Sequence, residues 1–202
     1  MYPYCFNHLD APPFSMNLPN KLTVSRFLAT GVFLGLAAIP ASVEGHLLWW
    51  KIAYLMAIVA GFTDILDGYI ARKYDLVTDF GKLIDPLADK VFTVGSYVTL
   101  VGHELCPAWI AVVLVAREFG VTGLRSLAAK RNIALAANNI GKAKTTCQML
   151  GLVFGGALWV GWLPLETCQV AWTWTLYGVA AFTAYSGWSY FYENRQLYMQ
   201  DT

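Results

Sequence analysis

Six mainly apolar segments divide the chain, each about as long as the 20 residues that an α-helix needs to cross a lipid bilayer. They cover residues 22–40, 46–71, 82–102, 108–130, 143–163 and 170–191. Prolines at positions 40, 107 and 164 mark three of the connections between them as turns. This pattern predicts an all-α, polytopic membrane protein with six transmembrane helices.

The residues ahead of the first apolar segment predict a short interfacial lead-in. The stretch NLPNKLT ends at Thr23, and we expect the first helix to start near Thr23 or Ser25. Residues 1–16 lack a charged start followed by an apolar run, so we do not expect a signal peptide. Met16 is an alternative initiator, which would make the first fifteen residues dispensable, and we interpret residues 1–16 as an N-terminal extension. No linker or repeat interrupts residues 17–202, which we interpret as one membrane domain.

The basic residues predict the orientation of the helices. The connections near 40–46, 103–107 and 164–169 contain no lysine or arginine, whereas the opposite helix ends carry most of the basic residues. Because lysine and arginine favour the cytoplasmic side, we expect both termini inside the cell. All tryptophans except Trp188 lie where segments meet the lysine-free connections, as an aromatic belt does.

The composition agrees with a location in the bilayer. Apolar residues make up 57% of the chain and charged residues 13%, about half the charged fraction of a typical soluble domain. We expect the lipid bilayer, and no nucleic acid, among the partners. The four cysteines show no CxxC spacing, so a zinc site is not supported. Whether Cys106 and Cys168 pair stays open.

Four aspartates interrupt the apolar pattern at regular spacing. Asp64 and Asp67 are three residues apart, and Asp85 and Asp89 four, so each pair lies on one helix face. At 1.5 Å per residue, both pairs lie about 6–12 Å from the inner ends of two antiparallel helices. We expect the four carboxylates to converge in a pocket open to the cytoplasm. Oxygen ligands alone favour Mg²⁺ or Mn²⁺, and two such ions balance the four charges.

Small residues and one arginine accompany these aspartates. Gly68, Ala71 and Gly81 leave space for a ligand, and the guanidinium group of Arg72 suits a phosphate. An alternative interpretation makes Gly68 and Ala71 helix-packing residues.

The aspartate segment carries a family resemblance. It fits D-x2-D-G-x2-A-R-x8-G-x3-D-x3-D at every fixed position, and this pattern resembles the signature of the CDP-alcohol phosphotransferase family. Members of that family transfer a phosphatidyl or similar group from a CDP-linked donor to an alcohol and release CMP. Two further stretches, NLPNKLTVSR and Arg117–Gln148, resemble one branch, the bacterial phosphatidylglycerophosphate synthases. This resemblance implies CDP-diacylglycerol and sn-glycerol 3-phosphate as substrates, a bacterial cell membrane as the location with a cytoplasmic active site, and a homodimer.

The resemblance also implies roles for individual residues. Asp64, Asp67, Asp85 and Asp89 would hold the two metal ions, and Asp89 would be the general base for the acceptor hydroxyl. The residues implied to contact CDP-diacylglycerol are Asn20, Thr23, Gly68, Ala71, Arg72, Thr78 and Gly81.

An acceptor that carries a phosphate needs cations near the aspartates. Arg117 lies inside an apolar segment, where a charge without a function is unfavourable. We predict that the acceptor phosphate binds Arg117, Arg125, Lys142 and Lys144. The alternative is that Arg117 pairs with an aspartate or with Glu118 and that the two lysines are ordinary positive-inside anchors. Lys90 is a further candidate for neutralising the aspartates.

Two other functions compete with this interpretation. A related transferase would use another acceptor, such as inositol phosphate, serine or phosphatidylglycerol, and the aspartate pattern does not discriminate among these. A cation- or proton-coupled transporter also places aspartates in the membrane. However, a transporter needs polar residues in both membrane halves, and here the outer half lacks ionisable residues apart from Lys51.

Overall fold

The computed structural model describes residues 18–73, 79–131, 133, 135 and 139–199, with side chains for residues 24–63, 84, 86–131, 133, 135 and 139–199. Within these ranges the chain forms seven helices and no strand, which confirms the predicted all-α class. The helices are α1 (Leu18–Ala37), α2 (His46–Lys73), α3 (Asp79–Gly102), α4 (Ala108–Lys130), α5 (Asn139–Trp159), α6 (Leu165–Glu193) and the short α7 (Gln196–Met199).

Several predicted helix boundaries need correction, above all at the starts of α1, α5 and α6. Helix α1 begins at Leu18, so the expected start near Thr23 or Ser25 is wrong, and the lead-in forms the first turns of the helix. Pro19 explains this, because proline fits the first turn of a helix, where its missing N–H group has no partner to lose. Helices α5 and α6 likewise begin four and five residues before the predicted positions 143 and 170. An apolar pattern underestimates a helix whose first turn is polar, as in Asn139–Lys142.

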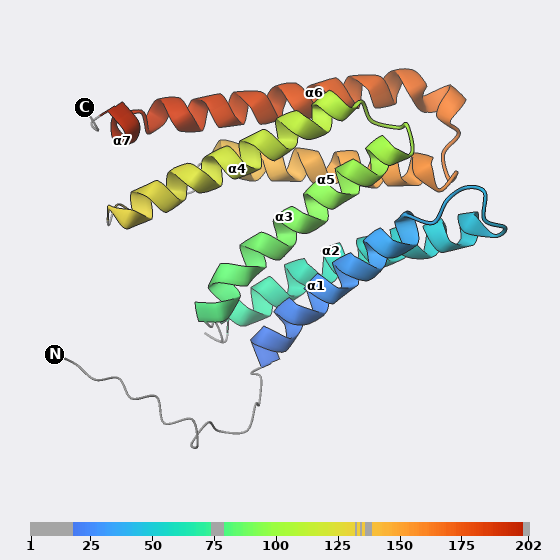
Figure 1. Ribbon diagram of the computed structural model, residues 1–202, viewed down its shortest axis with the longest axis horizontal. Helices are drawn as coiled ribbons and strands as arrows, with labels where there is room; N and C mark the ends of the chain where they lie inside the picture. The colour runs from blue at the N-terminus through green and yellow to red at the C-terminus, as the bar shows by residue number, and fades with distance from the viewer. Residues whose placement is uncertain (1–17, 74–78, 132, 134, 136–138, 200–202) are drawn as a thin grey trace.

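The helices run back and forth between two ends of the molecule (Figure 1). The connections α1–α2, α3–α4 and α5–α6 lie at one end, on the right of the figure. The C-terminus, the start of α1 and the far ends of α2 and α4 lie toward the other end. Helix α3 packs against α1, α4 and α5, and α5 packs against α2, α3 and α6. Helices α3 and α5 therefore join the two halves of the bundle.

A layer of aromatic side chains closes the end with the three connections. The Trp50 ring lies 4.5 Å from the His103 ring and 5.5 Å from the Trp159 ring, measured between centroids. Trp50 Nε1 donates to Ile39 O at 3.0 Å, and Trp172 Nε1 donates to Leu105 O at 2.6 Å. These bonds satisfy polar atoms that would be costly to bury unpaired, and they fasten the connections to the helices. His103 therefore has a structural role in the connection between α3 and α4.

Small residues allow the helices to approach closely. A Cβ at Gly156 of α5 would lie 2.2 Å from the Tyr54 ring of α2, which is an impossible contact. The same tyrosine donates its hydroxyl to Val153 O at 2.6 Å. Glycine at this position therefore lets α5 pack directly on the tyrosine, as small residues commonly do between membrane helices.

The described cysteines are all free. Cys106, Cys147 and Cys168 form no disulfide, which answers the open question about Cys106 and Cys168. Burial raises the pKa of the Cys106 thiol to about 11, so this thiol stays protonated at neutral pH.

Membrane crossing is only partly supported by helix composition. In the described residues, one segment, His46–Thr63, is both long and apolar enough to cross a bilayer by composition alone. The six predicted segments do coincide with the six long helices, which have 20 to 29 residues. The prediction that all six cross the membrane is therefore not confirmed by this measure.

Candidate functional site

The aspartate segment spans the end of α2 and the start of α3. Asp64 and Asp67 fall in the last turns of α2, and Asp85 and Asp89 fall in the first turns of α3. Of these four, only the side chain of Asp89 lies within the described residues. The predicted convergence of the four carboxylates therefore stays a prediction.

The residues predicted to contact CDP-diacylglycerol also fall outside the described side chains. The backbone of most of them is helical, whereas Thr78 lies outside the described residues altogether. For the others, the structure describes a helical backbone but no side chain. These residues are Asn20 and Thr23 in α1, Gly68, Ala71 and Arg72 in α2, and Gly81 in α3.

Asp89 interacts with a charged side chain from another helix. Its carboxylate is half-buried on α3 and interacts electrostatically with the Lys144 ammonium group on α5. Lys144 is only 3% exposed. A lysine buried to this degree is not a surface anchor, so the alternative interpretation of Lys144 is wrong. Burying an ammonium group without partners destabilises the folded protein, so Lys144 requires hydrogen-bond acceptors or opposite charges around it.

Glu118 of α4 is the main partner of Lys144. The Lys144 ammonium group donates a hydrogen bond to Glu118 Oε1 and forms an ion pair with it. Arg117 Nη1 lies 3.4 Å from the same oxygen. One carboxylate thus holds two cations, and the group of Arg117, Glu118 and Lys144 carries a net charge of about +1. We call these three residues the cation cluster.

Arg117 reaches from α4 to α6 through a slot between helices. Its Nη2 atom donates to Ser186 Oγ at 2.9 Å, while a Cβ at Gly187 would lie 3.1 Å from Arg117 Cγ. The absence of a side chain at Gly187 therefore leaves room for the arginine stem. The contact with Glu118 matches one of the two alternatives for Arg117. The buried Arg117 Nε has no hydrogen-bond partner among the described residues, so one N–H donor is left for a ligand.

Neighbouring hydrogen bonds fix the helices that carry the cation cluster. Lys90 Nζ donates to Thr122 Oγ1 at 2.5 Å, and Thr122 Oγ1 donates to Glu118 O at 2.6 Å, which ties α3 to α4. Lys90 therefore contacts α4, and its predicted role of neutralising the aspartates has no described contact in support. One turn beyond Lys144, the buried Gln148 donates to Thr183 Oγ1 of α6 at 3.2 Å.

The other two predicted phosphate-binding residues lie apart from the cation cluster. Arg125 Nε donates to Tyr190 OH at 3.0 Å, and the guanidinium carbon lies 5.4 Å from the centre of the Tyr190 ring. Lys142 is exposed at the start of α5, as expected of a positive-inside anchor. The structure thus brings Arg117 and Lys144 together and leaves Arg125 and Lys142 at the edge.

Sequence reasoning undervalued Glu118. It was considered only as an alternative partner of Arg117, although it is the residue that joins Arg117 to Lys144. A usable signal was present, because an adjacent arginine and glutamate inside an apolar segment both need partners in the protein interior.

Comparison with known proteins decides the family. Residues 16–185 match the family described as CDP-alcohol phosphatidyltransferase. The chain belongs to the CDP-alcohol phosphatidyltransferase family. This match includes the whole aspartate segment and the cation cluster.

Similar family members come from several bacteria. A Bacillus subtilis protein is 38% identical over 192 residues, which cover 88% of this chain and 95% of that protein. A Rickettsia typhi protein is 35% identical over 178 residues, which cover 87% of this chain and 95% of that protein. A Haemophilus influenzae protein is 37% identical over 148 residues, which cover 71% of this chain and 76% of that protein. All three are named CDP-diacylglycerol–glycerol-3-phosphate 3-phosphatidyltransferase.

The charge pairing in the cation cluster generates a stability prediction. We expect Glu118→Gln to lower the free energy of unfolding by about 3 kcal/mol, because it removes the carboxylate that pairs with the buried Lys144 and with Arg117. In the double variant Glu118→Gln/Lys144→Met, the Lys144 charge is removed as well, so the part of the loss that comes from Lys144 should be recovered, whereas Arg117 still lacks its carboxylate. Thermal and denaturant unfolding of the purified proteins in detergent measure both effects.

The exposed Glu44→Gln change is the matched control and should leave stability unchanged within about 0.5 kcal/mol. Equal destabilisation by the single and double variants would show that the two charges are not coupled.

Proposed function

We propose that the protein is a CDP-diacylglycerol–glycerol-3-phosphate 3-phosphatidyltransferase. It transfers the phosphatidyl group of CDP-diacylglycerol to sn-glycerol 3-phosphate and forms phosphatidylglycerophosphate and CMP. The observation that carries this proposal is the similarity over most of the chain to relatives that bear this name. The buried cation cluster supports it, because an acceptor with a phosphate group needs positive charge beside the reacting atoms.

The donor set of the aspartate segment suits a hard divalent cation. It consists of the carboxylate oxygens of Asp64, Asp67, Asp85 and Asp89, which fit two Mg²⁺ or Mn²⁺ ions in the proposed site. Asp89 interacts electrostatically with the positively charged Lys144, and it is the one of these four aspartates whose side chain the structure describes. When bound, such ions supply charge neutralisation to the diphosphate of the donor.

We assign Asp89 as the general base. Its carboxylate accepts the proton of the acceptor hydroxyl as that oxygen forms a bond to the β-phosphorus of the donor. The bond between the β-phosphorus and the bridging oxygen breaks, and CMP leaves with that oxygen. Lys144 interacts electrostatically with Asp89, so it also places a positive charge beside the base before the reaction.

The acceptor phosphate occupies the positive side of the same region. Arg117 and Lys144 bind it, since together they carry one more positive charge than Glu118 neutralises and Arg117 Nε keeps a donor available. Arg125 and Lys142 lie further out and attract the anion toward the site. The CDP part of the donor lies on the aspartate side, against the residues named above on α1, α2 and α3.

The long helices span the membrane six times, with both termini and the site on the cytoplasmic side. Large apolar side chains are exposed on several helices, which is unfavourable in water but suits contact with lipid. The most exposed are Phe62, Phe119, Leu150, Val170, Trp174 and Trp188, all between 67% and 73% exposed. We infer that residues 17–202 form the membrane domain, that residues 1–16 are dispensable, and that two copies form a homodimer in the bacterial cell membrane.

Cysteine labelling tests the orientation. Glu104→Cys lies in the α3–α4 connection and Lys130→Cys at the opposite end of α4, and both positions are exposed. In intact cells, and in a background with the native cysteines replaced by alanine, a membrane-impermeant maleimide should modify Glu104→Cys only. After permeabilisation it should modify both. Modification of Lys130→Cys in intact cells would reverse the proposed orientation.

A parallel acceptor assay tests the activity. Purified protein with CDP-diacylglycerol and Mg²⁺ should release CMP when sn-glycerol 3-phosphate is the acceptor. The rate of CMP release should be at least about a hundredfold lower with inositol phosphate, serine or phosphatidylglycerol, because these acceptors misplace the reacting hydroxyl. Protein that starts at Met16 should behave in the same way. Product formation with one of the other acceptors, and none with glycerol phosphate, would reject the assignment but keep the family.

A further inference from the structure

Glu118 already occupies the positive charges that the proposed acceptor needs. Its carboxylate accepts a hydrogen bond from Lys144 and lies 3.4 Å from Arg117 Nη1. Both contacts use Oε1, so a single carboxylate oxygen serves the two cations. A carboxylate of the protein thus pairs with the same two groups that we assign to the acceptor phosphate.

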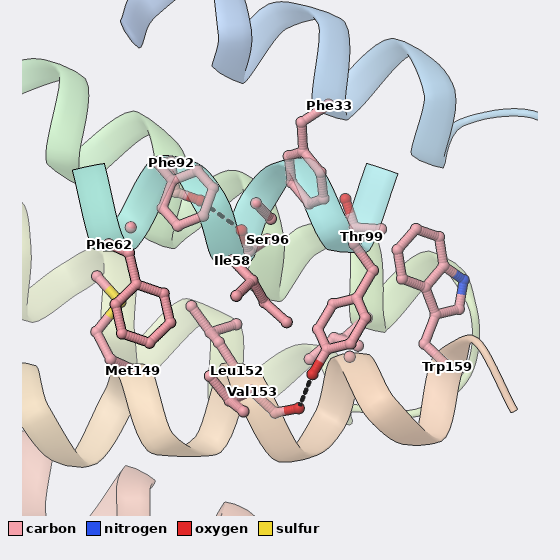
Figure 2. Close-up of a pocket in the computed structure, with 15 residues that line it drawn as sticks. Phe33, Ile58, Phe62, Phe92, Ser96, Thr99, Met149, Leu152, Val153 and Trp159 are labelled. Carbon is pink, nitrogen blue, oxygen red and sulfur yellow. Dashed lines mark hydrogen bonds between the residues drawn. The ribbon is translucent and has the colours of Figure 1, made fainter. Parts of the chain in front are cut away.

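The interior further along α5 supplies no other negative charge to Lys144. From Met149 onward, α5 borders a cavity of about 220 Å³ between α1, α2, α3 and α5 (Figure 2). No charged side chain lines this cavity, and its wall is almost wholly apolar. Among the described residues, the carboxylates that act on Lys144 are Glu118 and Asp89. Since we assign Asp89 to the metal ions and the acceptor hydroxyl, Glu118 is the carboxylate that neutralises the cation cluster.

The charge balance places Glu118 in competition with a bound phosphate. The cation cluster carries a net charge of about +1, and a phosphate monoester adds about −1.5 to −2 at pH 7. With the acceptor bound, two anions share two cations and the net charge is negative. The Glu118 side chain is only 11% exposed, so little water screens the repulsion between the two anions. Each anion therefore weakens the binding of the other.

Arg117 stays in place when the Glu118 side chain moves. Its Nη2 atom donates to Ser186 Oγ at 2.9 Å, a bond that does not involve Glu118. Its Nε atom has no hydrogen-bond partner among the described residues. A phosphate can therefore bind Arg117 through a free donor before Glu118 releases Lys144.

The product of the proposed reaction carries the same phosphate as the acceptor. Transfer joins the hydroxyl oxygen of the acceptor to the phosphatidyl group and leaves the acceptor phosphate unchanged. The product therefore binds Arg117 and Lys144 as the acceptor does. A carboxylate that weakens both interactions raises the KM for the acceptor and shortens the time for which the product stays bound.

We propose that Glu118 is an internal anion that competes with the phosphate of the acceptor and of the product for Arg117 and Lys144, and that it thereby promotes product release. The inference rests on the proposed function, since it takes the phosphate to bind these two cations. Glu118 is then a positioning residue, which holds the cation cluster together between turnovers and pairs with it again as the phosphate leaves.

Binding of the acceptor without turnover tests the sign of the effect. Isothermal titration calorimetry measures the Kd of sn-glycerol 3-phosphate for the full chain in detergent, with Mg²⁺ and without donor lipid. Glu118→Gln keeps an oxygen that can accept the Lys144 hydrogen bond but removes the charge, so it should lower this Kd about tenfold. A purely structural role predicts the opposite, because cations that lose their partner are no longer held in place. An equal or higher Kd in Glu118→Gln overturns the proposal.

Two further variants control for misfolding and for a general change in charge. Glu118→Asp keeps the charge but shortens the side chain by one methylene group, so it competes less well and should lower the Kd about threefold. A Kd for Glu118→Asp above that of the wild type overturns the proposal even if Glu118→Gln does not fold. Glu193→Gln removes an exposed carboxylate at the end of α6, outside the cation cluster, and should keep the Kd within about twofold. A tenfold lower Kd in Glu193→Gln would assign the effect to overall charge and also overturn the proposal.

Product inhibition tests the release step. In the transfer assay, Glu118→Gln should show a lower KM for sn-glycerol 3-phosphate and a lower kcat, because the product leaves more slowly. Added phosphatidylglycerophosphate should inhibit this variant at about a tenfold lower concentration than the wild type. Inhibition at an equal or higher concentration overturns the role in product release.

The outcomes separate this inference from the proposed function. If the wild type releases CMP with sn-glycerol 3-phosphate but Glu118→Gln does not bind this acceptor more tightly, the inference is overturned and the transferase is kept. If the wild type neither binds sn-glycerol 3-phosphate nor releases CMP with it, the proposed function itself is overturned.

Discussion

The cost of burying charge in an apolar bundle governs the functional end of this protein. Lys144 is almost completely buried, and the fold accommodates it because Glu118 of the neighbouring helix accepts its hydrogen bond. Arg117 shares the same carboxylate and crosses to Ser186 on α6. These contacts determine how α4, α5 and α6 are placed, since separating any pair would leave a charge without a partner. They also leave a net positive charge near Asp89, which is where the proposed function places the anionic acceptor.

The opposite end of the bundle is held by neutral contacts. There, the indole N–H groups of Trp50 and Trp172 donate to backbone carbonyls, and Gly156 lets α5 pack on the Tyr54 ring. Aromatic rings and satisfied hydrogen bonds of this kind give a rigid frame with no charge to bury. Among the described residues, the one charged side chain that is fully buried, Lys144, therefore lies away from this end. An apolar cavity lined by α1, α2, α3 and α5 lies between the two regions. This arrangement suits a substrate with a charged head group and hydrocarbon chains.

Much of the helical architecture could be predicted, because a long run of apolar residues between proline-marked turns can form few structures other than an apolar helix. The six long helices appear where the apolar segments predict them, and only their polar ends were misplaced, as at Leu18 and Asn139. Among the site residues, Lys144 was found from its position near the end of an apolar segment. Its pairing with Glu118 could not be predicted, because 26 residues separate the two, and only the packing of both α4 and α5 against α3 and α6 brings them together. The apolar cavity was equally hidden, since its walls come from four helices and read as ordinary core in the sequence.

The account depends most on Asp89 acting with the other signature aspartates as ligands of metal ions beside the cation cluster. Titration with Mn²⁺, followed by the electron paramagnetic resonance signal of free Mn²⁺, measures this directly for wild-type protein and for Asp89→Asn in detergent. The account predicts that each wild-type chain binds about two ions and that Asp89→Asn binds at least one ion fewer. The thermal stability of Asp89→Asn should be too close to that of the wild type to explain this loss. Equal stoichiometry and affinity in the two proteins would contradict it.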